Sequence, residues 1–204
     1  MNIRVALGAF VLLSLIPAHA QQSKPAVVAE GGQPDDRAST RVLYWNTVKH
    51  GAAGQFAIDY GRPVWKSVYE DPAKFDQMTK GKTWRMGSNF WTTLDSCLPL
   101  KISGKAVPPG YYYLGLHRSE DGLMWTLAFI DPAEVRAAHL DAFQIEKAPV
   151  AFEVPMFITK AVTKPEKLTI VLLYSKDNIH KVTLTVAWGT LALHTPIEVT
   201  VAEW

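Results

Sequence analysis

The sequence predicts an all-β fold, either an antiparallel β-sandwich or a partly open barrel, with one or two short helices. Short runs of aromatic and β-branched residues recur at roughly 8–12-residue spacing and are separated by turn residues. Within these runs apolar and polar side chains alternate, which is typical of antiparallel strands with one buried face. Only two segments carry helix-starting signals, and this argues against a βαβ fold.

The first twenty residues have the pattern of a secretory signal peptide. Arg4 precedes an apolar run from Val5 to Ile16, and the small-residue motif Ala18-His19-Ala20 follows. The apolar run is only about a dozen residues long, whereas a membrane span needs about 20. We therefore expect cleavage after Ala20, no retained membrane anchor, and a mature protein in the periplasm or secreted from the cell.

Residues 21–40 are expected to form a flexible leader, because they are rich in Gly, Pro, Ser and charge and have almost no large apolar side chain. A single β domain is expected from residue 41 to residue 204. Its run from Leu94 to Ile102 places every second side chain on one face and predicts a half-buried strand. Residues 111–117 alternate in the same way, and a turn at residues 119–122 leads into a return strand from Met124 to Ile130.

Short helices are predicted after Asp71-Pro72 and Asp131-Pro132, because Asp caps free amides and Pro suits the first helical position. These carboxylates are interpreted as caps rather than as catalytic acids. Val150 to Trp204 supplies at least four more strands, which include Leu168–Tyr174, Val182–Trp188 and Ile197–Val201.

Charge and motif content exclude several classes of function. The chain has 21 basic and 19 acidic residues, so removal of Arg4 leaves 20 against 19 and no nucleic-acid footprint. Cys97 is the single cysteine and is expected in a buried, apolar position rather than as a catalytic thiol. No phosphate loop, GxSxG motif or HExxH motif is present, and the five histidines after residue 20 are scattered. No metal or cofactor is therefore expected, and an enzyme is the less favoured hypothesis.

Two stretches combine arginine, a large aromatic residue and glycine: Asp59-Tyr60-Gly61-Arg62-Pro63 and residues 84–89. In each, a guanidinium could bind a carboxylate or phosphate of a ligand. The same arginines could instead tie a loop to backbone carbonyls, or pair with Asp59 or Asp95 inside the protein. Both interpretations remain open on the sequence.

These motifs, followed by Gly104-Lys105 and residues 108–112, resemble the DUF2911 family, a bacterial family of exported domains of unknown function. The resemblance covers about Phe56 to Trp204 and implies a largely β domain with no established activity. Where that family usually has glutamate after asparagine, this chain has Phe90 followed by Trp91. The positions that match the family pattern are Tyr60, Arg62, Trp84, Arg85, Gly87 and Asn89.

The leading hypothesis is a non-catalytic binding or structural module for a small-molecule or envelope ligand, with its oligomeric state left open. Its polar anchors would be Arg62, Arg85 and Asn89. Its aromatic walls would be Tyr60, Trp84 and Trp91.

The alternative is a cell-envelope hydrolase in which Arg85 and Asn89 stabilise an oxyanion. Its base would come from a neighbouring strand, as Asp59, Asp95 or His117. A third possibility is an envelope-assembly partner that presents a sheet edge.

Overall fold

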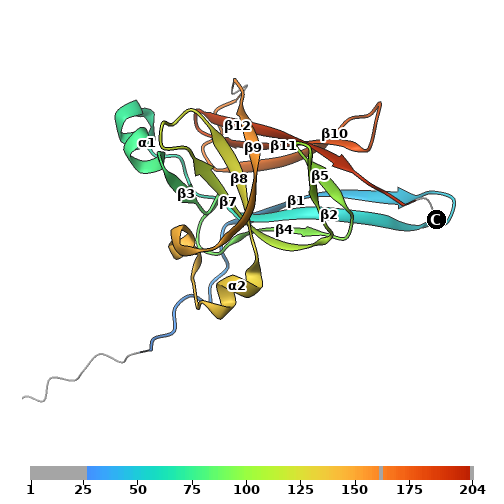
Figure 1. Cartoon of the computed structure of the whole chain (residues 1–204), viewed down its shortest axis with the longest axis horizontal. Coiled ribbons are helices and arrows are strands. Elements are labelled where there is room, and N and C mark those ends of the chain that lie inside the picture. The colour runs from blue at the N-terminus through green and yellow to red at the C-terminus, as the bar shows by residue number, and fades with distance from the viewer. Residues whose placement is uncertain (1–26, 161–162, 203–204) are drawn as a thin grey trace, which may run out of the picture. The chain divides into compact units, whose positions relative to one another are not determined.

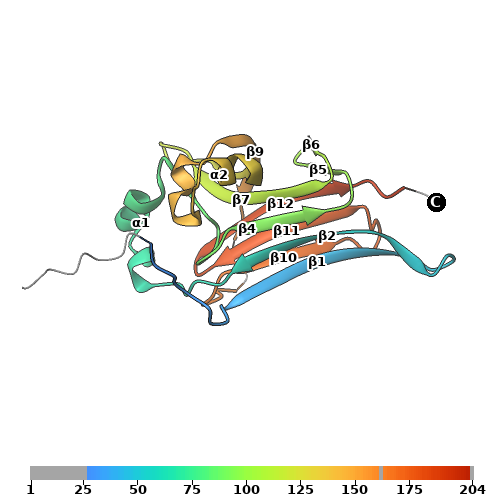
Figure 2. The ribbon, with the colours of Figure 1, turned by 90° about the horizontal axis from the view of Figure 1, so that it is seen from below.

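Twelve strands pair antiparallel and form one sheet that curls into a partly open barrel (Figures 1 and 2), which confirms the predicted fold class. The computed structural model describes residues 27–160 and 163–202, so the predicted signal peptide lies outside the described residues. Residues 27–33 are exposed and contain no helix or strand, and the barrel belongs to a separate unit that begins at Pro34.

The main path of the sheet follows the order β1 (Arg37–Asn46), β2 (Gly51–Gly61), β4 (Thr92–Ser96), β7 (Gly110–Arg118), β8 (Trp125–Ile130), β9 (Val150–Ile158), β12 (Leu191–Val199), β11 (Lys181–Trp188) and β10 (Thr169–Tyr174). Three short strands lie off this path. β3 (Lys82–Trp84) pairs with β7, and β5 (Leu100–Ile102) pairs with both β12 and β6 (Lys105–Val107).

Short helices interrupt the strands where the sequence predicts them. α1 (Pro72–Thr79) and α2 (Pro132–Ala137) begin after Asp71 and Asp131, whose carboxylates accept hydrogen bonds from the first backbone amides of each helix. The predicted capping roles are therefore confirmed. Two 3₁₀ helices, η1 (Ser67–Glu70) and η2 (Ala142–Lys147), complete the set. In the part of the chain that the structure describes, no helix is long and apolar enough to cross a membrane.

The predicted strand from Leu94 to Ile102 is divided into two strands that pair with different partners. Alternate burial continues through the whole run, but β4 pairs with β2 and β7 whereas β5 pairs with β12. Between them the Ser96 hydroxyl bonds both the N–H and the C=O of Leu98, and Pro99 has no N–H to donate to a ladder. The alternation predicted the faces correctly, while the change of partner was not visible in it.

Cys97 lies at this bend and is exposed, so the expectation of a buried position is wrong. The period of two places it on the outer face, between the buried residues Ser96 and Leu98. Its sulfur accepts a hydrogen bond from the N–H of Gln55 and donates one to the C=O of the same residue.

β1 begins at Arg37, so residues 37–40 belong to the sheet rather than to the predicted leader. The first residue of the strand is fixed by an ion pair between Arg37 and Asp59 of β2, and Ala38 packs against the core. The composition of residues 21–40 could not reveal this, because the partner of Arg37 lies 22 residues further along the chain.

β1 and β10 are the two ends of the sheet path, and side chains of β1 and the neighbouring β2 bond the backbone of β10 and of the segment that follows it. The buried phenol of Tyr60 accepts a hydrogen bond from Ile170 N at 3.0 Å and donates one to Ile170 O at 3.3 Å. Thr40 Oγ1 accepts a bond from Leu172 N at 3.2 Å. Tyr44 donates to Ile179 O at 2.8 Å, and burial raises the pKa of its phenol to about 12.

Replacement of Tyr60 by phenylalanine should lower the free energy of unfolding by about 1–3 kcal/mol, because two buried backbone groups of Ile170 lose this partner. Urea unfolding measures the effect, with Tyr174→Phe as the control, since Tyr174 is 57% exposed on β10. Equal urea midpoints for the wild type and Tyr60→Phe would show that this bridge does not stabilise the barrel.

Candidate functional site

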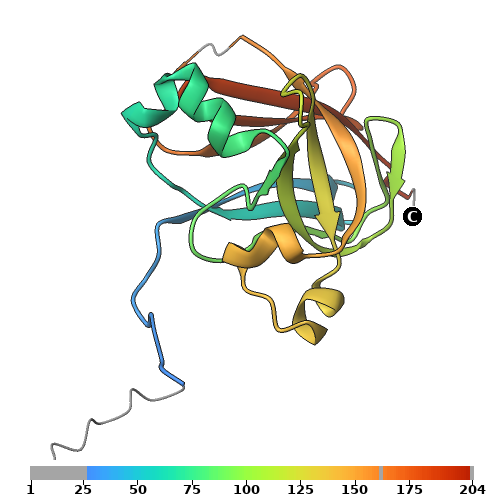
Figure 3. The same ribbon diagram turned by 60° about the vertical axis from the view of Figure 1, so that its left-hand side comes forward.

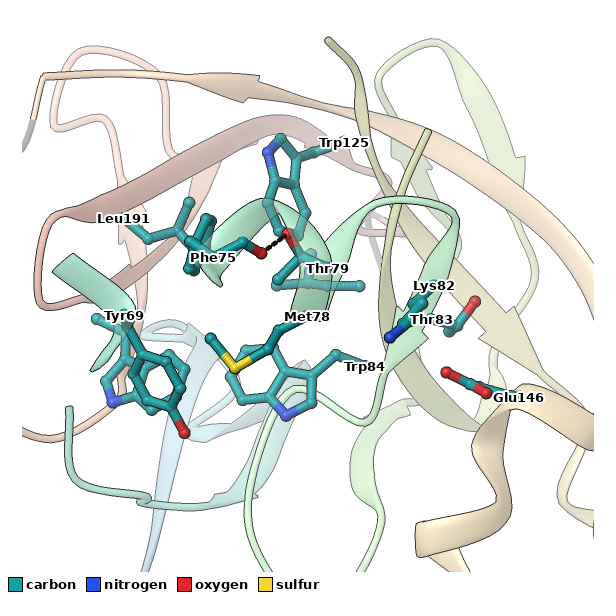
Figure 4. Close-up of a pocket in the computed structure, with 12 residues that line it drawn as sticks. Tyr69, Phe75, Met78, Thr79, Lys82, Thr83, Trp84, Trp125, Glu146 and Leu191 are labelled. Carbon is teal, nitrogen blue, oxygen red and sulfur yellow. Dashed lines mark hydrogen bonds between the residues drawn. The ribbon is translucent and has the colours of Figure 1, made fainter. Parts of the chain in front are cut away.

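An aromatic pocket with a volume of about 230 Å³ opens at the end of the barrel where α1 lies (Figures 3 and 4). Eight elements supply its walls, from η1 and α1 to the ends of β7, β8, β11 and β12. Most of the lining is apolar: Tyr69, Phe75, Met78, Trp84, Leu116, Trp125, Trp188 and Leu191. The other lining residues are Thr79, Lys82, Thr83 and Glu146.

Trp188 forms the base of this aromatic pocket. Trp84 stacks on it with ring centroids 5.0 Å apart and an angle of 14° between the rings. Trp65 and Tyr69 pack against it at 5.1 and 5.0 Å. The indole N–H of Trp188 donates to Pro63 O at 2.8 Å, so the ring is held in one orientation.

Gly189 leaves the space that Trp65 needs. A Cβ at this position would come within 2.0 Å of the Trp65 ring, and the backbone has a φ of +54°, which favours glycine. Gly189, in the turn between β11 and β12, therefore allows Trp65 to pack against Trp188 at the base of the pocket.

Arg118 holds α1 over the pocket. Its Nη1 donates to Asp76 Oδ1 and to Thr79 Oγ1, each at 2.8 Å, and its Nε donates to Gly122 O at 3.0 Å. The guanidinium also lies 5.6 Å from the ring centroid of Phe75, which is a pocket wall. Hydrogen bonds from Lys80 and Arg118 lower the pKa of the Asp76 carboxyl below its ordinary value.

Three of the four polar lining residues, Lys82, Thr83 and Glu146, gather at one side of the aromatic pocket, as Figure 4 shows. The fourth, Thr79, lies beside Phe75. Lys82 Nζ donates one hydrogen bond to Gln77 O at 3.0 Å and has two further N–H groups. Lys82 and Glu146 thus supply a donor and an acceptor beside apolar walls. This is the arrangement that orients a small ligand in a concave site.

Of the residues that the sequence singled out, Trp84 alone lines the aromatic pocket. Tyr60 bridges β2 to β10, and Arg62 Nε donates to Leu168 O at 3.4 Å on the chain entering β10. Trp91 lines a groove on the outer face of the sheet, where it stacks on Tyr113 at 4.7 Å.

Arg85 and Asn89 belong to the segment between β3 and β4. Their side chains contact Gly87 of the same segment and two residues outside it, Phe143 and Asp35. Arg85 Nε donates to Gly87 O at 3.2 Å, and its guanidinium lies 3.8 Å from the ring centroid of Phe143. Burial lowers the pKa of Arg85, with Asp141 acting in the opposite direction. Asn89 has a φ of +62° and donates to Asp35 Oδ1 at 2.6 Å.

The two sequence motifs lie backbone to backbone, which explains their glycines. A Cβ on Gly61 would come within 2.2 Å of Ser88 O, and a Cβ on Gly87 would come within 3.2 Å of Gly61 N. The close approach of these chains requires residues without side chains. The contacts of both motifs are thus largely internal, and their ligand-binding role stays a prediction.

The hydrolase hypothesis also stays a prediction. Arg85 and Asn89 bond different partners, His117 Nδ1 lies 3.2 Å from Thr83 Oγ1, and Asp59 forms the ion pair with Arg37. Among residues 27–160 and 163–202, no group of three or more His, Cys, Asp or Glu side chains is placed to hold a metal ion.

Sequence reasoning missed Arg118, Trp125 and Trp188 as site residues. The turn after Arg118 and the strands carrying both tryptophans were predicted, but Asp76, the partner of Arg118, lies 42 residues away in the sequence. No local pattern relates residues at that distance. A possible signal was the concentration of tryptophan at strand ends, because Trp84, Trp125 and Trp188 each begin or end a strand.

Replacement of Arg118 by methionine should loosen α1, because the helix loses the hydrogen bonds that Arg118 of β7 donates to Asp76 and Thr79. Amide hydrogen exchange measures this directly. The substitution should speed exchange in α1 relative to the wild type, and by more than it does in the β7–β8 hairpin. Arg136→Met, at an exposed position of α2, is the matched control. Unchanged exchange in α1 would contradict the role given to Arg118.

Comparison with known proteins places the chain in a family. Residues 45–197 match the sequence model of a family described as "Protein of unknown function (DUF2911)". No curated protein and no solved structure matched the chain. The match covers more than half of the sequence and includes the Tyr60, Arg62, Trp84 and Arg85 motifs. The chain therefore belongs to the DUF2911 family.

Proposed function

We propose that this chain is an exported, non-catalytic binding protein that takes a small, planar, largely apolar molecule into its aromatic pocket. The observation that carries this proposal is the pocket itself, whose walls are aromatic and aliphatic and three of whose four polar residues stand at one side. Such a composition is typical of small-molecule sites, and the mouth of a β-barrel is a usual place for them.

The size of the pocket limits the ligand to one or two fused rings. Its volume is about 230 Å³, whereas an engineered apolar cavity of about 150 Å³ is sufficient to bind benzene. A planar ring inserted beside Trp84 would meet further rings on Phe75 and Trp125. Offset-stacked and edge-to-face contacts would then stabilise it beyond simple area burial.

A binding role is favoured over catalysis by what the polar groups of the pocket do. Thr79 Oγ1 donates to Phe75 O at 2.7 Å and accepts from Arg118, so its hydroxyl is held away from any base. Lys82 and Glu146 stand at the polar side, where they can bond the edge of a ligand. An activated nucleophile needs a base within hydrogen-bond reach, and Thr83 Oγ1, which lies 3.2 Å from His117 Nδ1, is the lining hydroxyl on which the alternative hydrolase hypothesis would rest.

Export is supported by the first twenty residues, in which Arg4, the apolar run and the small-residue motif follow the order of a signal peptide. The mature protein is then located in the periplasm or outside the cell. N-terminal sequencing of the exported protein tests this, and a terminus other than Gln21 would contradict the proposed cleavage site.

Indole should raise the thermal midpoint of the wild-type protein, because it binds the folded state. At about ten times its Kd, the expected stabilisation is about 1.4 kcal/mol, or about 3–6 °C for a domain of this size. Met78→Trp adds an indole ring to the three tryptophans that already line the pocket and occupies space that a ligand would need, since Met78 lines the pocket and is 38% exposed. The thermal midpoint of this variant should be the same with and without free indole.

Met124→Trp is the matched control, because Met124 is 64% exposed and does not line the pocket. It should respond to indole as the wild type does. An equal response in Met78→Trp would place the binding elsewhere. Absence of any response in the wild type at millimolar indole would contradict a site for planar apolar molecules.

A further inference from the structure

A second hollow, the outer groove, lies on the outer face of the sheet over β1, β2, β4 and β7, the strands that Figure 2 shows side by side. Its volume is about 550 Å³. Strand register sets its floor in two rows. One row contains Asp59, Thr93 and Tyr113, and the next contains Ala57, Asp95 and Tyr111.

Four aromatic residues line this groove: Phe90, Trp91, Tyr111 and Tyr113. Tyr111 is 47% exposed and meets Tyr113 edge to face at 6.0 Å, while Tyr113 stacks on Trp91 at 4.7 Å. Phe90 is 64% exposed and also lines the groove. Since large apolar side chains are normally buried, ring surface left in solvent beside a polar floor indicates a contact surface.

The lining of the outer groove holds one arginine and two aspartates, and Arg41, beside it on β1, balances their charge. Arg37 Nε donates to Asp59 Oδ1 at 2.8 Å, and its Nη2 donates to Trp91 O at 3.2 Å, so the first cation is already paired. Arg41 of β1 lies opposite Ala57, in the same row as Asp95. Two guanidinium groups thus accompany two carboxylates on this face. Neither an anionic nor a cationic ligand would find an excess of opposite charge.

We infer that the outer groove binds a neutral saccharide. A pyranose ring with equatorial hydroxyls has apolar C–H faces, which pack on aromatic rings such as Tyr111, and a polar edge of donors and acceptors. The floor offers that edge carboxylate oxygens from Asp59 and Asp95 and the hydroxyl of Thr93, each able to bond a sugar hydroxyl. Balanced charge favours a neutral polyol over an amine or an acid.

The volume and the diagonal placement of the two carboxylates indicate more than one contacting sugar unit. Asp59 and Asp95 are diagonal neighbours on paired strands, which separates their Cα atoms by about 7–8 Å. One pyranose ring can reach one carboxylate with its hydroxyls while its neighbour reaches the other. An oligosaccharide laid across β2, β4 and β7 would contact both rows of the floor.

Isothermal titration calorimetry with cellohexaose and chitohexaose tests this inference on the mature protein. Binding of at least one probe is expected, and Tyr111→Ala should weaken it about tenfold or more, which corresponds to about 1.4 kcal/mol. Tyr174→Ala is the matched control, because Tyr174 is 57% exposed and lies outside the groove. It should bind as the wild type does.

Asp95→Asn keeps the test valid if Tyr111→Ala does not fold, because Asp95 is exposed and the amide has almost the same shape. It should also weaken binding, since an amide accepts weaker hydrogen bonds than a carboxylate. No binding of either probe at millimolar concentration would overturn the inference, as would equal binding by Tyr111→Ala and Asp95→Asn. Met78→Trp should bind the saccharide normally, so failure here and failure of the aromatic pocket are distinguishable.

Discussion

Residues 60–65 run along residues 166–170, and the position of the aromatic pocket depends on this contact. Tyr60 bonds both backbone groups of Ile170, Pro63 O accepts from Leu168 N at 3.0 Å, and Trp65 N donates to Glu166 O at 2.6 Å. The sheet path ends at β1 and β10, and these bonds hold the end of β2 and the residues after it against β10 and the chain that enters it.

The same contact places the base of the pocket. Pro63 O accepts a second hydrogen bond, from the indole N–H of Trp188, and Trp65 packs edge to face on that ring. Trp84 then stacks on the ring of Trp188. The motif at residues 59–63, which the sequence analysis interpreted as a possible ligand contact, thus helps to shape the aromatic pocket by holding Trp188 in place.

Much of the fold could be predicted because local rules decide it. Alternation identified the buried faces, and Asp-Pro pairs identified both α-helices. The division of the strand at Pro99 was missed because a period of two continues through a change of partner. Most of the aromatic pocket was missed because its residues meet across strands, whereas the outer groove contains Trp91, Asp59 and Asp95, which the sequence had singled out for other roles. Tyr69 and Trp188, for example, are neighbours only after the barrel has formed.

Phe90 departs from the family pattern in the sequence and lines the outer groove in the structure. It stands where the resembling family usually has glutamate, and its ring centroid lies 5.9 Å from the Arg37 guanidinium at the wall of the outer groove. A carboxylate there would compete with Asp59 for Arg37, whereas phenylalanine leaves that ion pair intact and adds ring surface. The departure from the family pattern therefore changes the chemistry of the outer groove and leaves the aromatic pocket untouched.

The proposed binding of a planar molecule at the barrel end depends on the rings around Trp188. A crystal structure of the mature protein grown with indole tests it most directly. Indole density is expected between Trp84 and the rings of Phe75 and Trp125, with the indole N–H directed to the side of Glu146. Indole bound only at another surface, or an aromatic pocket filled by its own side chains, would contradict the proposed binding site.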